Sequence, residues 1–318
     1  MTKGELMENL YGKKIIITGS NGFLGKSICK EFDSQGLDYY RVLSSQYDLI
    51  KHEQVSALFE EQKPDIIFHL AADCGGIAYN VSKPADLAYN NMLMTLNIFK
   101  NAIEFGSPKI IMIGSVDSYP GEASIPYTES ELWEGFPEET SAYYGIAKRM
   151  NIALGEAYYK QYGLSSIHIL LMNLYGPNDH FDEVRGHVIP AIIKKIDNAN
   201  KHNLNYVDIY GDGSPIREFV FVEDAAKLII KSSSIEGFAY FNLGSGQLLK
   251  ILDVLNIIKD EIGFKGEFIK DMTKPMGHPI KKFDLHKMNV LLDKFDYTPF
   301  EEGIRETINF FNNKVKKN

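Results

Sequence analysis

The chain has 318 residues, of which 44% are hydrophobic and 24% are charged, and its formal net charge is −8. This composition is typical of a folded globular protein with a substantial core. The acidic balance argues against a nucleic-acid partner, because binding to a phosphate backbone needs a dense basic face. The two cysteines, Cys29 and Cys74, lie far apart in the sequence. They indicate reduced thiols rather than a disulfide framework or a metal site, so no metal is expected.

The N-terminal segment has no targeting signal in its composition. Residues 1–10 mix charged and polar side chains and lack the apolar core of a signal peptide. Elsewhere no apolar run approaches the roughly 20 residues that cross a bilayer. We therefore expect a cytoplasmic protein without a membrane partner.

Short β-rich runs alternate with helical stretches from residue 14 to about residue 174. We expect strands at 14–18, 39–43, 65–70, 109–113 and 166–171, and helices at 23–35, 53–61, 84–104 and 141–161. Pro64 stops the second helix and Pro84 opens the third, where a proline is tolerated. Strands that alternate with helices predict an α/β fold with a Rossmann-type, doubly wound parallel sheet.

The regular alternation ends near residue 174, and the chain is polar and rich in turns up to residue 186. Beyond it we expect a helix at 188–198, a strand at 207–210, a turn at 211–215, a helix at 222–232 and a strand at 240–243. The last two return to the main sheet, which predicts a cofactor-binding domain formed by 1–174 and about 218–246. About 175–217 and 247–318 are expected to form a smaller mixed α/β substrate-binding lobe.

A glycine-rich turn follows the first strand. It reads Thr18-Gly19-Ser20-Asn21-Gly22-Phe23-Leu24-Gly25. Gly19 permits the tight turn, Gly22 lets the backbone approach a pyrophosphate, and Gly25 permits close packing of helix on strand. The free N–H groups of the helix N-terminus then face the phosphates. In this strand–turn–helix context, residues 19–25 predict a dinucleotide-binding site.

A tyrosine and a lysine, Tyr144 and Lys148, lie four residues apart on the helix expected at 141–161. This spacing places them on one helical face, where an ammonium lowers the pKa of a nearby tyrosine and suits it to proton transfer. Ser115 follows the fourth strand, whose end faces the cofactor crevice in this fold. We therefore expect Ser115 to hydrogen-bond the same substrate oxygen as Tyr144.

These three residues and the glycine turn together resemble the catalytic set of the extended short-chain dehydrogenase/reductases. Among these, the chain resembles the GDP-L-fucose synthase family, which epimerises and reduces a GDP-4-keto-6-deoxymannose. The resemblance covers about residues 14–310. It is carried by HLAADCGGI (69–77), 84–97, NLYGP (173–177), GHVIPA (186–191), YGDGSPIREFVFVED (210–224) and KPMGHPIKKFD (274–284).

The resemblance implies a role for each catalytic residue. Tyr144 protonates the C4 oxygen of the sugar as hydride arrives from NADPH, and Ser115 orients that oxygen. Lys148 holds the nicotinamide ribose and tunes the tyrosine. The family also moves protons at C3 and C5 of the sugar with a cysteine and a histidine, and His187 matches the histidine. A lone histidine is more often structural, but the position of His187 beside a polar loop favours function.

Asp117 stands where the family has its cysteine, because the family segment GSSCIYP reads GSVDSYP at 114–120. A thiol suits proton removal beside a carbonyl, whereas a carboxylate with a pKa of about 4 is a weaker base unless desolvated. One interpretation is a C4 reductase with lost or reduced 3,5-epimerase activity. Another is a nucleotide-sugar 4,6-dehydratase or epimerase that recycles its cofactor, since dehydratases carry a glutamate near this place. Asp117 could also be an ordinary loop residue. A silent cofactor-binding regulator is disfavoured by the retained catalytic set.

The second expected strand ends without the acidic residue that NAD-preferring folds use to hold ribose hydroxyls. Its small hydroxyls, beginning with Ser44, can accommodate a 2′-phosphate, so NADP(H) is predicted, with NAD(H) as the alternative. The family places arginines near this site, where this chain has Asn21 and Ser44. Asp48 resembles the family residue near the adenine and could equally cap the next helix. The remaining predicted cofactor contacts are Leu49, Leu70, Ala71 and Ala72.

Arg217 resembles the family arginine that grips the sugar-nucleotide diphosphate, and a guanidinium suits this task through paired hydrogen bonds. The alternative is a surface salt bridge to Glu218 or Glu223. Asn173, His187 and Lys281 are further substrate-binding candidates by resemblance, and the GDP moiety itself rests on the resemblance alone.

The helices expected at 84–104 and 141–161 are rich in apolar side chains. On the first these include Met92, Met94, Leu96, Ile98 and Phe99. In related enzymes the two helices form a four-helix bundle across a dimer, so a homodimer is expected; the alternative is burial within one chain. Altogether, the sequence predicts NADPH-dependent C4 reduction of a GDP-4-keto-6-deoxy hexose or heptose.

Overall fold

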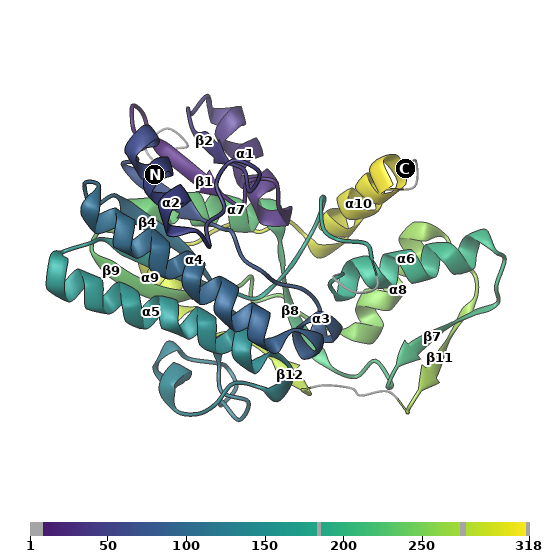
Figure 1. Cartoon of the computed structure of the whole chain (residues 1–318). Helices are drawn as coiled ribbons and strands as arrows, with labels where there is room; N and C mark the ends of the chain where they lie inside the picture. Colours follow the sequence, from purple (N-terminus) through teal and green to yellow (C-terminus); the bar gives the residue numbers. More distant parts are fainter. Residues whose placement is uncertain (1–8, 183–185, 274–277, 316–318) are drawn as a thin grey trace.

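A six-stranded parallel sheet in the order β2-β1-β3-β4-β5-β9 forms the centre of the molecule (Figure 1). The computed structural model describes residues 9–182, 186–273 and 278–315. Strands β1, β3 and β5 are buried along their whole length, as expected for strands covered by helices on both faces. The strands are β1 (Ile15–Thr18), β2 (Tyr40–Val42), β3 (Ile66–His69), β4 (Lys109–Ser115), β5 (Ser166–Leu171) and β9 (Phe238–Leu243). The predicted fold class is confirmed.

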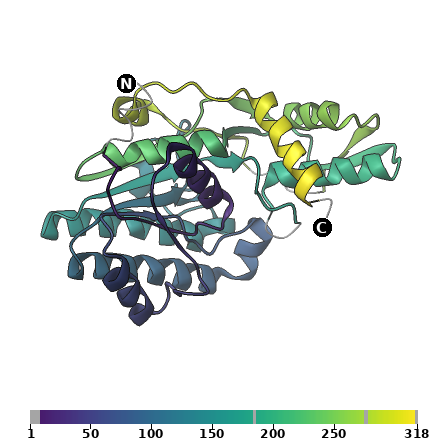
Figure 2. The same ribbon diagram turned by 90° about the horizontal axis from the view of Figure 1, so that it is seen from above.

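Helices form a layer on each face of the sheet (Figure 2). On one face, α1 and α7 pack over a core that includes Ile28, Phe32 and Leu228. On the other face, Phe59 of α2 and Phe99 of α4 are buried in a second core, and α5 lies beside α4. The helices are α1 (Phe23–Gln35), α2 (His52–Gln62), α3 (Ile77–Ser82), α4 (Pro84–Glu104), α5 (Ala142–Tyr162), α7 (Val222–Lys231) and α9 (His286–Leu292). Because β2 and β3 flank β1, the strand order reverses beside β1, where α/β sheets of this type bind ligands.

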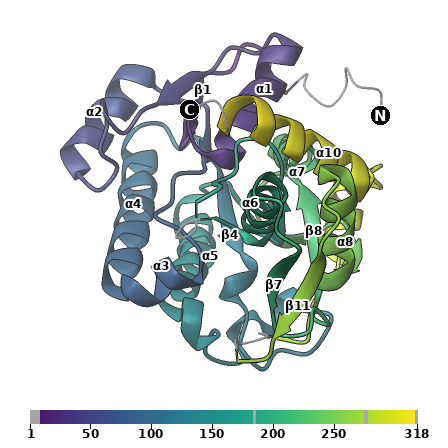
Figure 3. The same cartoon turned by 90° about the vertical axis from the view of Figure 1, so that its right-hand side faces the viewer.

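The remaining elements lie at one side of the sheet and enclose a separate hydrophobic cluster, which includes Tyr175, Ile193 and Phe300 (Figures 1 and 3). Strand β8 pairs with β6, β10 and β12, and β7 pairs in parallel with β11. The strands are β6 (Asn173–Tyr175), β7 (Tyr206–Tyr210), β8 (Ile216–Phe221), β10 (Leu248–Lys250), β11 (Glu267–Asp271) and β12 (Ile280–Lys281). The helices are α6 (Val188–Lys201), α8 (Ile251–Ile262) and α10 (Phe300–Phe310).

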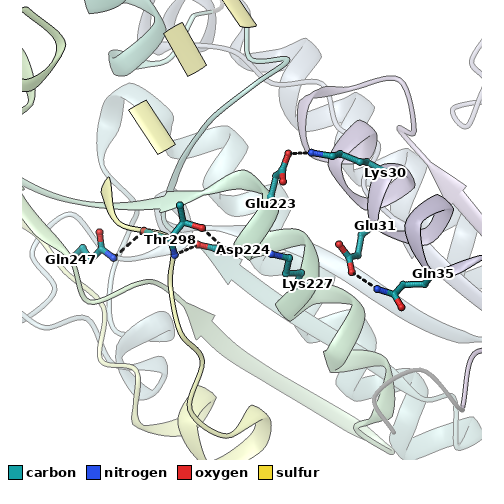
Figure 4. Close-up of polar contacts among 8 residues, drawn as sticks. All are labelled: Lys30, Glu31, Gln35, Glu223, Asp224, Lys227, Gln247 and Thr298. Atoms are coloured by element: carbon teal, nitrogen blue, oxygen red, sulfur yellow. Dashed lines mark hydrogen bonds and ion pairs between the residues drawn. The ribbon is translucent and has the colours of Figure 1, made fainter. Parts of the chain in front are cut away.

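Helix α7 ties these elements to the glycine-turn side of the sheet (Figure 4). At its N-terminus, Glu223 pairs with Lys30 of α1. The neighbouring Asp224 accepts hydrogen bonds from the amide (2.7 Å) and hydroxyl (3.0 Å) of Thr298, two residues before α10. Gln247 also reaches the Thr298 carbonyl, at 3.4 Å. The acidic pair at this helix start therefore joins segments from both ends of the chain.

Most of the predicted elements are present. The helices at 23–35 and 84–104 and the strand at 166–171 have the predicted bounds, whereas β4 extends to Ser115. The elements that were not predicted are α3, the strands β6, β8, β10, β11 and β12, and the helices α8 to α10. Several of these strands are two or three residues long, and β8 contains charged side chains, so neither period nor composition marks them.

Most of the apolar side chains of α4 face the interior of the same chain. Met94, Ile98 and Phe99 are buried against the sheet, whereas Leu96 is 42% exposed. Burial within one chain therefore accounts for three of the five residues named above. In the described ranges, no helix combines the length and apolarity that a bilayer crossing requires.

Candidate active site

The glycine turn packs tightly against the chain that leaves β3. Gly19 has a φ of 67°, and a Cβ there would lie 2.7 Å from the amide nitrogen of Ala71. A Cβ on Gly25 would overlap the Gly19 carbonyl and lie 2.8 Å from the Ser20 Cα. Gly22 precedes α1, and within the described ranges no side chain caps this helix start. The turn therefore requires glycine for steric reasons and leaves the N–H groups of the first helical turn available.

Hydrogen bonds between Thr18 and residues 69–71 join the ends of β1 and β3 next to this turn. The Thr18 hydroxyl lies 2.9 Å from Nδ1 of His69 and accepts the amides of Leu70 and Ala71, both at 3.2 Å. Burial, and then the charge of Lys148, lower the pKa of His69 to about 3, so this histidine stays neutral. These hydrogen bonds hold residues 70–72 beside the glycine turn, where they were predicted to contact the cofactor.

The side chains of the turn differ in exposure. Asn21 is exposed, Phe23 is half-buried and Leu24 is buried in the core beneath α1. The Ser20 hydroxyl is buried, and among the described residues it has no hydrogen-bond partner. A glycine cradle with a buried hydroxyl and an uncapped helix start fits the phosphates of a dinucleotide.

The segment after β2 folds back into a turn. Ser44 is exposed there, and the Asp48 carboxylate accepts the Ile50 amide at 3.1 Å. Residue 51, not Asp48, precedes α2, so the capping alternative for Asp48 is wrong. Leu49 is buried under α4, where Asn97 donates to its carbonyl at 2.9 Å.

Tyr144 and Lys148 lie on the face of α5 that meets the end of β4. The ammonium of Lys148 is 5.6 Å from the centre of the Tyr144 ring and donates to the Ile113 carbonyl at 2.9 Å. Burial lowers the pKa of Lys148 to about 8. Burial, followed by the nearby Cys74 and Asp117, raises the pKa of Tyr144 well above its usual value. The expectation that the ammonium would lower the pKa of this tyrosine is wrong here, because desolvation dominates.

Ser115 and Asp117 form a small hydrogen-bonded ring at the end of β4. The Ser115 hydroxyl donates to the Asp117 carboxylate at 3.2 Å and accepts the Asp117 amide at 3.1 Å. The segment is seated on α5, because a Cβ at Gly145 would overlap the Asp117 carbonyl. Arg149 of α5 donates to the Ser118 carbonyl and, at 2.6 Å, to that of Gly135. The structure therefore holds this loop rigidly beside Tyr144.

His187 directly precedes α6, and its ring lies 6.2 Å from that of Phe23 in the glycine turn. Its Nδ1 is 2.9 Å from the buried carboxylate of Asp179. Burial would lower the pKa of His187, but the hydrogen bond to Asp179 and the charges of Asp179 and Asp117 outweigh burial and raise it. Asp179 was missed by the sequence analysis, because only the folding of the turn-rich stretch reveals this pairing.

Three predicted substrate residues lie on adjacent strands. Arg217 of β8 is the register partner of Lys281 of β12, and Asn173 of β6 donates to the Glu218 carbonyl at 3.1 Å. The alternative, a surface salt bridge of Arg217 to Glu218 or Glu223, is wrong. Glu218 accepts the amides of Gly246 and Phe283, and Glu223 pairs with Lys30.

A small pocket beside these strands has polar walls formed by Asp117, Tyr127, Glu138, His278 and Lys281. Lys281 pairs with Glu138 at 3.0 Å. Burial would raise the pKa of Glu138, but the charges of Lys281, His278 and Arg217 lower it. Tyr127, Glu138 and His278 were not predicted as site residues. No local pattern distinguishes them, and residues 274–277 of the KPMGHPIKKFD segment lie outside the described ranges.

These features define a nucleotide-binding α/β enzyme fold with a Ser–Tyr–Lys set beside a glycine turn. The model of the NAD dependent epimerase/dehydratase family matches residues 15–237, and the chain belongs to this family. It is 33% identical over 310 residues to a GDP-L-fucose synthase from Sinorhizobium fredii, covering 97% of this chain and 98% of the relative.

Two solved structures support the same grouping. A GDP-L-fucose synthetase from Naegleria fowleri bound to NADP superposes with a TM-score of 0.88 at 28% identity, covering 96% of this chain and 94% of that one. A GDP-6-OMe-4-keto-L-xylo-heptose reductase from C. jejuni superposes with a TM-score of 0.87 at 25% identity, covering 96% and 98%. The resemblance inferred from the sequence motifs is therefore confirmed at the level of the family.

Proposed function

We propose that the protein is an NADPH-dependent C4 reductase of a GDP-4-keto-6-deoxy hexose or heptose, with lost or reduced 3,5-epimerase activity. The observation that carries the proposal is the grouping of Ser115, Tyr144 and Lys148 at the end of β4. The neighbouring strand β3 ends against the glycine turn. Relatives and solved structures named for GDP-fucose synthesis and GDP-heptose reduction support the substrate class.

NADPH, when bound, supplies the hydride that adds to C4 of the sugar and is itself oxidised to NADP+. The Tyr144 hydroxyl gives its proton to the C4 oxygen, so that the ketone becomes an alcohol, and solvent returns a proton to Tyr144. The raised pKa keeps the phenol protonated, so its proton is present for transfer although the phenol is a weaker acid. Ser115 turns its hydroxyl from the Asp117 carboxylate to orient the C4 oxygen, and Lys148 holds the ribose. Arg217, Lys281 and Asn173 hold the diphosphate end of the substrate.

The proposed loss or reduction of 3,5-epimerase activity rests on Asp117. Its carboxylate already accepts the Ser115 hydroxyl, and it occupies the position of a thiol that suits proton removal from carbon. The second candidate, a dehydratase or epimerase that recycles its cofactor, is favoured by one observation: the charge of Asp117 acts on both Tyr144 and His187. In that reaction Asp117 moves a sugar-carbon proton.

Turnover in D2O separates the two candidates. With NADPH and GDP-4-keto-6-deoxymannose we expect absorbance at 340 nm to fall, and the product to carry no deuterium at C3 or C5 by mass spectrometry and NMR. Tyr144→Phe should abolish the absorbance change, whereas Tyr143→Phe, the exposed neighbour on the same helix, should preserve it. Formation of an epimerised product without net NADPH consumption would instead support a cofactor-recycling epimerase.

The remaining expectations are part of the same proposal. The cofactor domain comprises residues 1–174 and about 218–246, the other segments bind the nucleotide sugar, and the protein acts in the cytoplasm. Two copies pair through the outer faces of α4 and α5, where Tyr89, Leu96 and Tyr162 are exposed. Sedimentation should give a dimer for the wild-type protein and a monomer for Leu96→Glu.

A further inference from the structure

We propose that the Glu138 carboxylate competes with the substrate for Lys281. The substrate diphosphate must displace this carboxylate before it can bind the Lys281 ammonium. The inference deepens the proposed function, on which it rests. Its basis is the 3.0 Å ion pair between the two side chains, which both line the small pocket that also contains Asp117 and Tyr127.

The backbones on both sides of this ion pair are fixed. Strand β12 pairs with β8, and the Tyr127 amide donates to the Lys282 carbonyl at 2.8 Å. On the other side, the Glu138 carbonyl accepts the Ser141 amide at 3.0 Å just before α5. The two side chains can therefore exchange partners without a change in these backbone hydrogen bonds.

The charges in the pocket favour such an exchange. Arg217 is the register partner of Lys281 on the adjacent strand, and His278 lines the same pocket. The Glu138 carboxylate thus lies near the charges of Lys281 and Arg217, and a diphosphate requires such cationic side chains. The Lys281 side chain is 18% exposed and the Glu138 side chain is 32% exposed, so solvent partly screens the ion pair. Two phosphate groups can therefore outcompete one carboxylate for the lysine.

The consequence is that Glu138 weakens diphosphate binding. If Glu138 becomes neutral, Lys281 is released and the pocket gains one positive charge. We expect Glu138→Gln to tighten GDP binding by about fivefold, the size of a partly exposed ion pair, and to make it more dependent on salt concentration.

Isothermal titration of GDP onto the full-length protein tests this inference without turnover. Glu139→Gln is the matched control, because this adjacent glutamate is exposed and carries the same charge. In a Lys281→Met background, Glu138→Gln should change the affinity by less than about twofold, because the contested ammonium is gone.

Weaker or unchanged GDP binding by Glu138→Gln would overturn the proposal, and so would an equal gain from Glu139→Gln or in the Lys281→Met background. Lack of GDP binding by the wild-type protein would also overturn it. The proposed reductase activity fails separately, namely when NADPH is not oxidised although GDP binding responds to Glu138→Gln as expected.

Discussion

The two ends of the candidate site are built in different ways. The cofactor end is one continuous turn between β1 and α1, in which Gly19 and Gly25 pack against backbone with no room for a side chain. The substrate end combines side chains from three strands, β6, β8 and β12, which are far apart in sequence. Steric fit of the backbone therefore governs the first end, and pairing of charges governs the second. Substitutions should consequently act steeply at the turn and gradually at the strands.

The largest effect is expected from Gly25→Ala. The added methyl group would collide with the Gly19 carbonyl, so the turn must open and the helix start must shift away from the phosphates. We expect NADPH affinity, measured by titration of cofactor fluorescence, to fall at least about 100-fold, or about 2.7 kcal/mol.

Gly36→Ala provides the control for this substitution. Gly36 ends α1 with a φ of 67°, but among the described residues no atom beyond its chain neighbours lies within 4 Å of its added Cβ. It should cost about 1 kcal/mol of folding stability through backbone strain while leaving cofactor affinity unchanged. Equal losses of affinity in both variants would show that helix α1, rather than the turn, controls binding.

At the substrate end, Arg217→Lys should have a smaller effect. The charge is retained but the paired hydrogen-bonding geometry is lost, so we expect KM for the GDP sugar to rise about tenfold and kcat to change by less than about threefold. Steady-state kinetics at saturating NADPH measure both. Arg305→Lys, which alters an exposed ion pair with Glu261, should change neither. A fall in kcat with KM unchanged would place Arg217 in the chemical step instead.

The same contrast explains how much could be predicted from the sequence. The glycine turn and the Tyr144–Lys148 pair are local patterns, with spacings set by one turn or one helix, and both were found. Glu138 and Asp179 gain their partners, Lys281 and His187, only through tertiary folding. The pKa of Tyr144 was predicted in the wrong direction because helical spacing gives the distance to a charge but not the desolvation around it.

The pH dependence of reduction tests the electrostatics of the catalytic pair. Lys148 should lose its charge above a pKa of about 8, whereas Tyr144 keeps its proton because its pKa is raised. We therefore expect kcat/KM to be level below about pH 8 and to fall about tenfold by about pH 9. Lys148→Arg, whose charge does not titrate, should be slower but level over this range. A wild-type profile that stays level to about pH 10 would contradict the lowered pKa of Lys148.

The last prediction concerns the stability of the fold, and it too differs between regions of the molecule. His69 of β3 and His168 of β5 are buried, and burial is the main reason why the pKa of each is lowered to about 3. Unfolded histidines have a pKa of about 6.5, so between these values the unfolded chain binds more protons than the folded one. Stability from these residues is complete above pH 6.5 and is lost as pH falls toward 3. Each should cost about 1.4 kcal/mol at pH 5.5.

Urea unfolding at pH 8 and pH 5.5 measures this loss, and His168→Gln should remove about half of it. His202→Gln, at the exposed end of α6, should leave the pH dependence unchanged. The pH dependence contributed by His187 has the opposite sign. Its pKa is raised in the folded state, so its contribution to stability is present at low pH and is lost as pH rises through that pKa. Hydrogen exchange at pH 5.5 should therefore show that acid loosens the central sheet before the elements around α6. Earlier exchange around α6 would show that buried histidines do not determine the acid sensitivity of the fold.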